Sequence, residues 1–220
     1  MGAEVPKQYL EINGRSLLQY SLEALLACPS IESVTVALHP DDSRASSIAL
    51  LADPRVHAIS GGAERADSVL AGLLDLAGRA ADDAWVLVHD AARPCLATED
   101  IERLIAAVSR SGQGAILAQP LVDTIKRGGP DGLVEATLDR DQLWRAQTPQ
   151  MFQLAQLCQA LQQALERGLP VTDEASAMEL AGYPVQLVQG SPANLKVTVA
   201  EDLALAGWYL SRRIPKGEDN

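Results

Sequence analysis

An acidic and a basic side chain come together in the segment HDAARP, residues 89–94, directly after a short apolar run. Two alanines separate Asp90 from Arg93, and side chains this small leave room for a ligand to approach the backbone. Ligands of open α/β sheets bind beyond the carboxyl ends of the strands, so this segment is a candidate binding loop. A strand-to-helix turn capped by Asp90, with Arg93 as its surface partner, accounts for the same residues equally well.

Paired glycines precede a predicted apolar helix in the segment SGGAERADSV, residues 60–69. Backbone N–H groups in such a turn can face an anion or the edge of a base. A Gly-Gly turn is common between elements of secondary structure, so this segment taken by itself favours an ordinary turn.

Two lysines complete the set of candidate residues. Lys196 lies in NLKVT, residues 194–198, which is predicted to be a short apolar strand. Burying an ammonium group there is costly unless it meets an anion. Lys7 follows Pro6, whose fixed backbone angle sets the direction of the turn. Without a functional role, Lys196 would be an ordinary lysine on a solvated edge strand, and Lys7 an ordinary lysine in a surface loop.

Short apolar runs alternate along the chain with helical patterns. The runs Ser33–Leu38 and Ala84–Val88 predict buried strands, and residues 114–118 predict a weaker third. Apolar residues recur at helical spacing in four segments, with Thr98 as the N-cap of the second: residues 18–26, 98–108, 154–165 and 203–210. This alternation predicts an α/β fold, with a doubly wound, mainly parallel sheet in a single domain, residues 1–220.

Residues 121–148 break the alternation of strands and helices. They are polar, contain the pair Gly128-Gly129, and are patterned as short strands rather than as a helix. We therefore expect a β-arm that leaves the core.

Composition narrows the classes of partner. The net charge of −11 argues against nucleic acid, which needs a broad basic surface, but still allows a small anion held by local cations. No apolar run approaches the ~20 residues of a membrane span. The three cysteines and three histidines lack metal-ligand spacing, which makes a zinc site unexpected. A reduced cytoplasmic location fits this cysteine usage best.

Seven segments together resemble the methylerythritol-phosphate cytidylyltransferases, in their order and in their spacing. They are PKQYL, GGAERADSV, LVHDAARP, DTIKR, DRDQLWRAQTPQ, TDEASAMEL and NLKVTVAEDLALA. The resemblance extends from Gly2 to about Arg212, which is nearly the whole chain. It implies a Rossmann-like nucleotidyltransferase fold and a Mg²⁺-dependent reaction. CTP and methylerythritol phosphate are joined in this reaction, and pyrophosphate is released.

The resemblance also implies a role for each matching residue. Lys7 and Lys196 are the expected catalytic residues, on the leaving-group side and the attacking side of the α-phosphate. Residues expected to bind the nucleotide are Gly62, Ala63, Arg65, Ser68, Asp90 and Ala91. Residues expected to bind the acceptor are Asp90, Arg93 and Thr172, joined by Thr124 and Arg140 from the β-arm of a second subunit in a homodimer. Asp90 is the possible metal contact, with Mg²⁺ held mostly by phosphates.

Two alternatives to this function stay open. Ribitol 5-phosphate cytidylyltransferases share much of the motif set, and a non-catalytic nucleotide-binding protein is the reading from a different class. The sequence also departs from the family pattern at Ala63, where relatives often carry Asp. The family opens with a strand and a glycine-rich loop of the form PAAGxGxRM, and this sequence begins at the Met of that motif. We expect upstream residues that carry the loop, because a chain without them would be marginally folded and nearly inactive.

Overall fold

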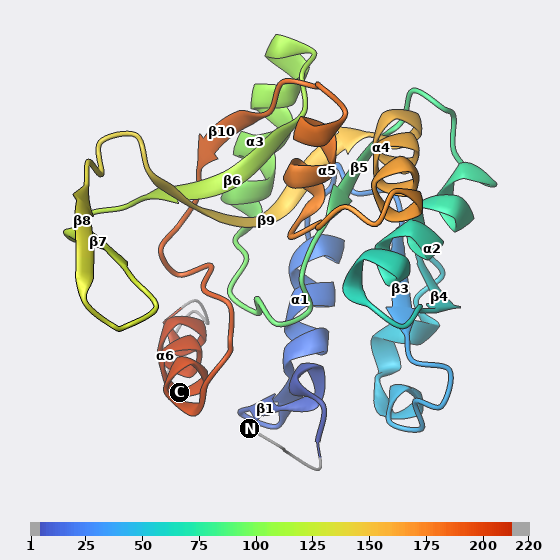
Figure 1. Ribbon diagram of the computed structural model, residues 1–220. Coiled ribbons are helices and arrows are strands. Elements are labelled where there is room, and N and C mark those ends of the chain that lie inside the picture. The colour runs from blue at the N-terminus through green and yellow to red at the C-terminus, as the bar shows by residue number, and fades with distance from the viewer. Residues whose placement is uncertain (1–4, 213–220) are drawn as a thin grey trace.

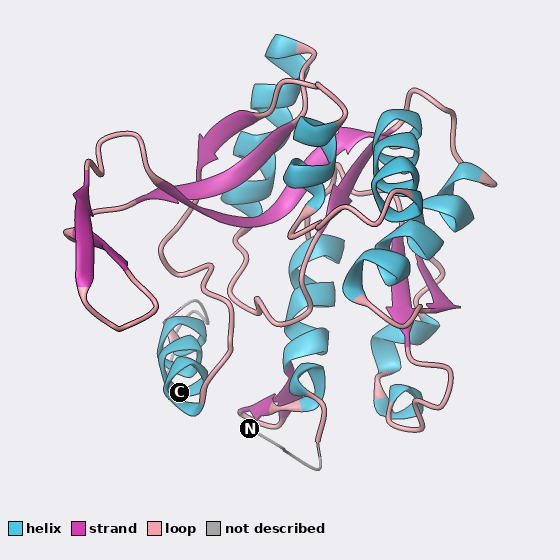
Figure 2. Cartoon of the chain, in the orientation of Figure 1, coloured by secondary structure: helices cyan, strands magenta, loops and turns pink. Residues whose placement is uncertain are grey.

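The computed structural model describes residues 5–212. Met1–Glu4, which further residues are expected to precede, lie outside the described residues. Figure 1 shows the elements in chain order, and Figure 2 separates helices from strands. The elements are η1 (Lys7–Tyr9), β1 (Glu11–Ile12), β2 (Arg15–Ser16), α1 (Leu17–Leu26), β3 (Val34–Leu38), η2 (Ala45–Ser47), η3 (Ala49–Ala52), β4 (Val56–Ser60), α2 (Arg65–Ala77), β5 (Trp85–Val88), α3 (Thr98–Ser111), β6 (Ala115–Pro120), β7 (Ile125–Gly128), β8 (Val134–Leu138), β9 (Trp144–Gln153), α4 (Leu154–Glu166), α5 (Glu174–Leu180), β10 (Gln186–Gln189) and α6 (Ala200–Ser211).

The central strands form a four-stranded sheet in the order β10-β6-β9-β5 and a separate parallel pair, β3-β4. β10 and β6 pair in parallel, whereas β9 runs antiparallel to both of its neighbours, β6 and β5. Three of the four strands in the larger sheet therefore point the same way, as the prediction of a mainly parallel sheet requires. In residues 5–212, the edge strand β5 of the larger sheet does not pair with β3 or β4. The central strands therefore form two sheets rather than one continuous sheet.

Helices cover both faces of the larger sheet because its strands alternate buried side chains between the two faces. On one face, Leu87, Ala115 and Leu117 pack in a cluster with residues of α1 and α3. On the other face, Ile116 and Phe152 pack with residues of α2, α4 and α5. The doubly wound α/β fold expected from the sequence is confirmed.

The β-arm leaves the body of the protein as a two-stranded antiparallel sheet formed by β7 and β8 (Figure 1). Its base closes where the Leu121 N–H donates to the Leu143 carbonyl. Residues 144–148, which the sequence analysis assigned to the arm, instead begin β9 in the core sheet. The strand was not predicted because its segment QTPQ is polar. The polar side chains of this segment are buried and make hydrogen bonds, so they give no apolar pattern.

Two local expectations from the sequence were wrong, and one helix was missed. Ala97 rather than Thr98 is the N-cap of α3, and Thr98 is its first helical residue. Residues 194–198 form a loop and not a strand, since tertiary hydrogen bonds determine their path. Helix α5 was not expected, because seven residues are too few to show a clear helical period.

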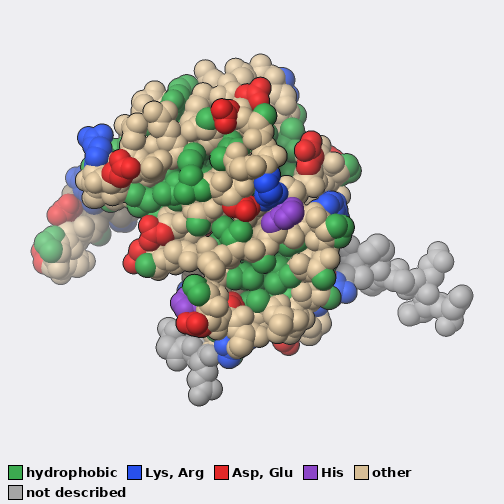
Figure 3. All heavy atoms as spheres, turned by 90° about the vertical axis from the view of Figure 1, so that its right-hand side faces the viewer, with side chains coloured by type: hydrophobic (Ala, Val, Ile, Leu, Met, Phe, Trp, Pro, Cys, Tyr) green, Lys and Arg blue, Asp and Glu red, His purple; other side chains and the backbone are tan. Residues whose placement is uncertain are grey.

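Charged side chains of both signs lie on the surface (Figure 3). On the face shown in Figure 3, Lys and Arg side chains are scattered among acidic and apolar ones rather than gathered into one basic surface. Within residues 5–212, no helix combines the length and the apolar character needed to cross a bilayer.

The packing of α3 on the sheet gives a prediction about stability. Leu104 is fully buried in the cluster between α3 and β6. Replacing Leu104 with Ala leaves a cavity that rigid neighbours cannot fill, so we expect the free energy of unfolding to fall by about 2–5 kcal/mol. Urea unfolding followed by circular dichroism measures this loss. Leu74→Ala is the matched control, because Leu74 is 54% exposed on α2 and its loss is expected to cost under about 0.5 kcal/mol.

Candidate active site

The carboxylate of Asp90 lies just beyond the end of β5, where three cations converge on it. Its Oδ1 accepts from Arg65 Nε at 3.0 Å. Its Oδ2 lies 3.0 Å from Lys196 Nζ and 3.6 Å from Arg93 Nε. Burial opposes the ionisation of Asp90, but the three cations outweigh it and lower the pKa of its carboxyl group to about 2. Asp90 is therefore ionised at neutral pH.

Lys196 reaches Asp90 because its loop is fastened to the strand ends. The Val197 N–H donates to the Ala92 carbonyl at 2.8 Å, which joins the lysine's neighbour to the loop after β5. Arg93 Nη1 donates to the Asn194 carbonyl at 2.8 Å, and Asn194 Nδ2 donates to the Thr148 carbonyl at 2.7 Å. Asn194 is fully buried, so these bonds are made away from water.

Thr148 and His89 hold the backbone of Asp90 from behind. The Asp90 N–H donates to Thr148 Oγ1 at 3.0 Å, and this hydroxyl lies 3.0 Å from His89 Nδ1. His89 Nε2 lies 3.2 Å from the Arg93 carbonyl, which can only accept, so Nε2 carries the proton and Nδ1 accepts from Thr148. Burial lowers the pKa of His89 to about 4, which keeps the ring neutral at physiological pH. His89 thus stabilises the loop through hydrogen bonds and is not assigned a role as general acid.

Arg65 connects Asp90 to a second carboxylate on α5. Its Nη1 and Nη2 donate to Glu174 Oε1 and Oε2 at 2.8 and 3.0 Å. Burial works against the charge on Arg65, but Glu174 and Asp90 together raise its pKa above the ordinary value. Arg93 differs, because burial dominates there and lowers its pKa although Asp90 opposes the change.

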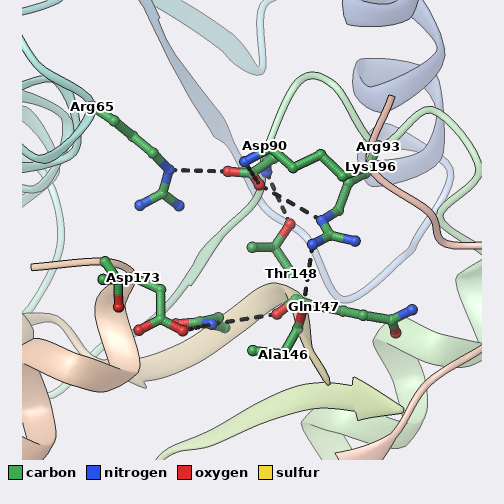
Figure 4. A pocket seen from close by; sticks show the side chains of 10 residues that line it. Arg65, Asp90, Arg93, Ala146, Gln147, Thr148, Asp173 and Lys196 are labelled. Atoms are coloured by element: carbon green, nitrogen blue, oxygen red, sulfur yellow. Dashed lines mark hydrogen bonds and ion pairs between the residues drawn. The ribbon is translucent and has the colours of Figure 1, made fainter. Parts of the chain in front are cut away.

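These side chains surround a pocket of ≈ 260 Å³, shown in Figure 4. Arginine and lysine side chains from α2 and from two loops meet the Asp90 carboxylate on one side, and polar groups of β9 and the segment before α5 form the other. The lining residues are Arg65, Asp90, Arg93, Ala146, Gln147, Thr148, Gln150, Thr172, Asp173 and Lys196. A pocket that presents three cations suits a ligand with several negative charges, such as a phosphate ester.

Five residues singled out from the sequence line this pocket together: Arg65, Asp90, Arg93, Thr172 and Lys196. The other predicted residues lie elsewhere. Ala91 belongs to the same loop as Asp90 but is not among the lining residues. Lys7 is exposed in η1, near Asp202 at the start of α6. Hydrogen bonds from Thr198 and Val199 lower the pKa of Asp202, and the charge of Lys7 adds to this effect.

Gly62 and Ala63 lie in the turn that leads into α2, and Ser68 lies in the first turn of this helix. Ser68 Oγ accepts from the Gly62 N–H at 3.1 Å and donates to the Glu64 carbonyl at 3.2 Å, so the serine shapes the turn. A Cβ on Gly62 would lie 2.3 Å from the Cβ of Asp67, which explains the glycine. These three residues do not line the pocket.

Thr124 and Arg140 are exposed on the β-arm, outside the pocket of their own chain. Within the arm, the Arg140 guanidinium donates to the Val122 carbonyl.

Sequence reasoning missed the polar residues that support the site: Gln147, Thr148, Gln150, Asp173 and Glu174. Gln147, Thr148 and Gln150 are each at most 3% exposed although they lie in a core strand. Gln150 donates to Asp173 Oδ2 and accepts from the Ala175 N–H, both at 2.8 Å, and so ties the start of α5 to β9. The sequence signal that could have indicated them is the group of three polar side chains in QTPQ, directly before the apolar residues near the end of β9.

The residues described contain no group of three or more His, Cys, Asp or Glu side chains that could hold a metal ion. Asp90 is nevertheless an ionised oxygen donor that lines the pocket. Mg²⁺ commonly binds through one or two carboxylates and completes its coordination with water and substrate phosphates. Among the lining residues, Asp90 is the carboxylate that a divalent cation bound to a phosphate ligand would contact, in place of one of the cations that meet its two oxygens.

The lowered pKa values of His89, caused by burial, and of Asp90, caused by its three cations, predict how stability depends on pH. Both groups have a lower pKa in the folded protein than their ordinary values of 6.5 and 3.8, so the unfolded chain takes up protons first. The free energy of unfolding is therefore expected to fall as the pH drops from about 6.5 to about 4, and to fall again from about 4 to about 2. The His89 step amounts to about 3 kcal/mol.

Urea unfolding of chelator-treated protein between pH 7.5 and pH 3.5 measures the His89 step. His89→Gln is expected to be less stable at pH 7 and to lose the slope between about pH 6.5 and 4. His39→Gln is the control and is expected to keep the slope, since His39 is exposed. An unchanged slope in the His89 variant would contradict this assignment.

Comparisons with known proteins agree on one family. Residues 1–212 match the family described as IspD: 2-C-methyl-D-erythritol 4-phosphate cytidylyltransferase. A relative of that name from Photobacterium profundum is 51% identical, over 96% of this chain and 91% of the relative. Another from Shewanella sediminis is 52% identical, over 96% of this chain and 88% of the relative.

Solved structures agree as well. A 4-diphosphocytidyl-2C-methyl-D-erythritol synthase matches with a TM-score of 0.84 at 39% identity, over 93% of this chain and 95% of the other. The Francisella tularensis 2-C-methyl-D-erythritol 4-phosphate cytidylyltransferase matches with a TM-score of 0.83 at 34% identity, over 94% of both chains. The fold, the cation-rich pocket and these matches lead to one conclusion: this chain belongs to the 2-C-methyl-D-erythritol 4-phosphate cytidylyltransferase family.

Proposed function

We propose that this protein transfers the cytidylyl group of CTP to 2-C-methyl-D-erythritol 4-phosphate. A phosphate oxygen of the acceptor attacks the α-phosphorus of CTP in line and forms a new P–O bond. The bond between the α-phosphorus and the bridging oxygen breaks, so that pyrophosphate leaves and 4-diphosphocytidyl-2-C-methyl-D-erythritol remains. The observation that carries the proposal, beside the family, is the convergence of three cations on Asp90 in one pocket.

Catalysis in this proposal consists of positioning and neutralisation of charge. A phosphate oxygen is already an adequate nucleophile, so no serine, threonine or cysteine has to be activated. Lys196 is 45% exposed and uses one of its three donors on Asp90, which leaves donors for an α-phosphate oxygen. Arg93 holds the acceptor from the same side of the pocket, with Thr172 opposite. Lys7 is assigned to the α-phosphate and its leaving group.

The cytosine is assigned to the turn before α2. Backbone groups of Gly62 and Ala63 are exposed, and Ser68 holds this turn in shape. Close backbone contact of this kind admits a pyrimidine and excludes a larger purine. Arg65, Asp90 and Ala91 complete the nucleotide side of the proposed site, with Asp90 near the ribose.

Magnesium ion is the proposed cofactor, and Asp90 is the residue that would hold it. When bound, Mg²⁺ would neutralise charge on the phosphate oxygens of CTP. Removing divalent cations with a chelator is accordingly expected to abolish turnover, and adding Mg²⁺ is expected to restore it.

A homodimer is proposed in which the β-arm of one subunit completes the site of the other. Its support is the apolar surface of the arm: Val122, Leu133 and Val134 are 74%, 68% and 63% exposed. In this arrangement Thr124 and Arg140 bind the phosphate of the acceptor in the neighbouring site. Arginine suits this role, because its planar guanidinium can bind a phosphate through two parallel hydrogen bonds.

The protein is proposed to act in the cytoplasm on small molecules, without nucleic acid or membrane partners. Cys28 and Cys158 are free thiols in the part of the chain that the structure describes, as a reducing compartment favours. Ribitol 5-phosphate is the competing acceptor, and the relatives and structures described above are named for the methylerythritol compound instead.

Lys196 supplies the direct test of this function. Pyrophosphate release from CTP, with methylerythritol phosphate and Mg²⁺, is expected to fall roughly 100- to 1000-fold in Lys196→Ala, because one charge on the α-phosphate is no longer neutralised. Arg110→Ala is the control and is expected to keep full activity, since Arg110 is exposed in the last turn of α3.

The same assay with ribitol 5-phosphate separates the acceptors, and faster turnover of ribitol phosphate would overturn the assignment. Folded protein that is silent with both acceptors would favour a non-catalytic nucleotide-binding role.

Mixing two impaired variants tests whether Arg140 acts across the dimer. Arg140→Ala is expected to raise the KM for the acceptor phosphate while the KM for CTP stays nearly constant. In a mixed dimer of Arg140→Ala and Lys196→Ala subunits, one of the two sites receives both intact residues. Equal mixing after subunit exchange is therefore expected to restore about a quarter of the normal activity at low acceptor concentration. No restoration, in subunits shown to exchange, would place Arg140 in the site of its own chain.

A further inference from the structure

Glu174 is a buried carboxylate that lies behind the pocket rather than in it. The residue is 1% exposed and is not among those that line the pocket. It begins α5, whose N-cap is Asp173. Gln150 fixes both of its neighbours, because it donates to Asp173 Oδ2 and accepts from the Ala175 N–H. The position of Glu174 is thus set by β9, the central strand of the site.

Both oxygens of Glu174 are used to hold Arg65. The two terminal nitrogens of Arg65 meet the two carboxylate oxygens at 2.8 and 3.0 Å, which leaves Nε to meet Asp90 at 3.0 Å. Arg65 is the first residue of α2, where the helix dipole disfavours a cation. The pair of hydrogen bonds to Glu174 offsets this cost and fixes the plane of the guanidinium.

The result is a row of alternating charges that leads from α5 to the pocket: Glu174, Arg65, Asp90, Lys196. Within this row, Arg65 meets only Oδ1 of Asp90, while Oδ2 meets Lys196 at 3.0 Å and Arg93 at 3.6 Å. An Arg65 released from Glu174 can turn both terminal nitrogens toward Asp90 and bind both of its oxygens. Lys196 would then lose its partner and its fixed position.

We propose that Glu174 is a positioning residue, which holds Arg65 away from the Asp90 oxygen that contacts Lys196. The proposal rests on the proposed function for its effect on cytidylyl transfer. Glu174 makes no contact with substrate in this role. Its contribution is the direction in which Arg65 and then Asp90 point.

The experiment compares Glu174→Gln, Arg65→Gln and the double variant. Glu174→Gln is expected to lower kcat about 10- to 100-fold, the usual range when a partner behind a direct ligand is removed. The KM for CTP is expected to change much less. Because Glu174 acts through Arg65, the double variant is expected to be no slower than Arg65→Gln alone. Glu179→Gln, on the exposed side of the same helix, is the matched control and is expected to keep full activity.

A purely structural role for Glu174 gives a different result. Thermal unfolding would then show a lower Tm for Glu174→Gln, while kcat measured well below that Tm would match the control. Either this outcome, or losses in the two single variants that multiply in the double variant, would overturn the proposal.

A spectroscopic measurement keeps the test independent of activity. In protein with ¹⁵N-labelled arginine, the Nε–H signal of Arg65 is identified by its loss in Arg65→Lys. This signal is expected to shift in Glu174→Gln and to stay in place in Glu179→Gln. If the unsubstituted protein has no transferase activity, the proposed function fails, and the position of this signal alone decides the role of Glu174. An unmoved signal would overturn the role.

Discussion

An ionised carboxylate in a partly closed pocket is the constraint on which the rest of the site depends. Asp90 is only 11% exposed, and leaving its charge unpaired there would be costly. Three cations meet this cost, and they come from α2, from the loop after β5 and from the loop before α6. The charge of Asp90 therefore holds together segments that are far apart in the sequence. The same arrangement gathers the cations that a phosphate ligand needs.

Buried polar groups, rather than apolar packing, give the site its shape. Thr148, Gln150 and Asn194 each satisfy a backbone or side-chain partner at the strand ends, and each is nearly inaccessible to water. Hydrogen bonds in such surroundings are strong and directional, so they fix positions that loops would otherwise sample. The helices and the larger sheet supply a frame, and these groups aim the charged side chains within it.

Local charge and net charge act on different scales in this protein. The chain carries a net charge of −11, and yet its pocket presents Arg65, Arg93 and Lys196 against Asp90 and Asp173. Distant acidic side chains are screened by salt over about 8 Å at physiological ionic strength, whereas contacts near 3 Å are not. The pocket therefore offers local positive charge to a small phosphate ester, although the chain as a whole is negatively charged.

The class of fold can be predicted from the sequence alone, because strand and helix periods depend on neighbouring residues. The runs at Val34–Leu38 and Trp85–Val88 and the periodic helices were identified in this way. The order of motifs also determined the family, and with it the identity of Asp90, Arg93 and Lys196 as candidates.

The three-dimensional structure was needed to show which candidates meet. It placed five of them around one pocket, kept Lys7 and the β-arm residues outside it, and revealed the supporting roles of Thr148 and Glu174. The physical reason is distance along the chain, since Arg65 and Glu174 are 109 residues apart. No local pattern records a hydrogen bond that forms only when the sheet and its loops have packed.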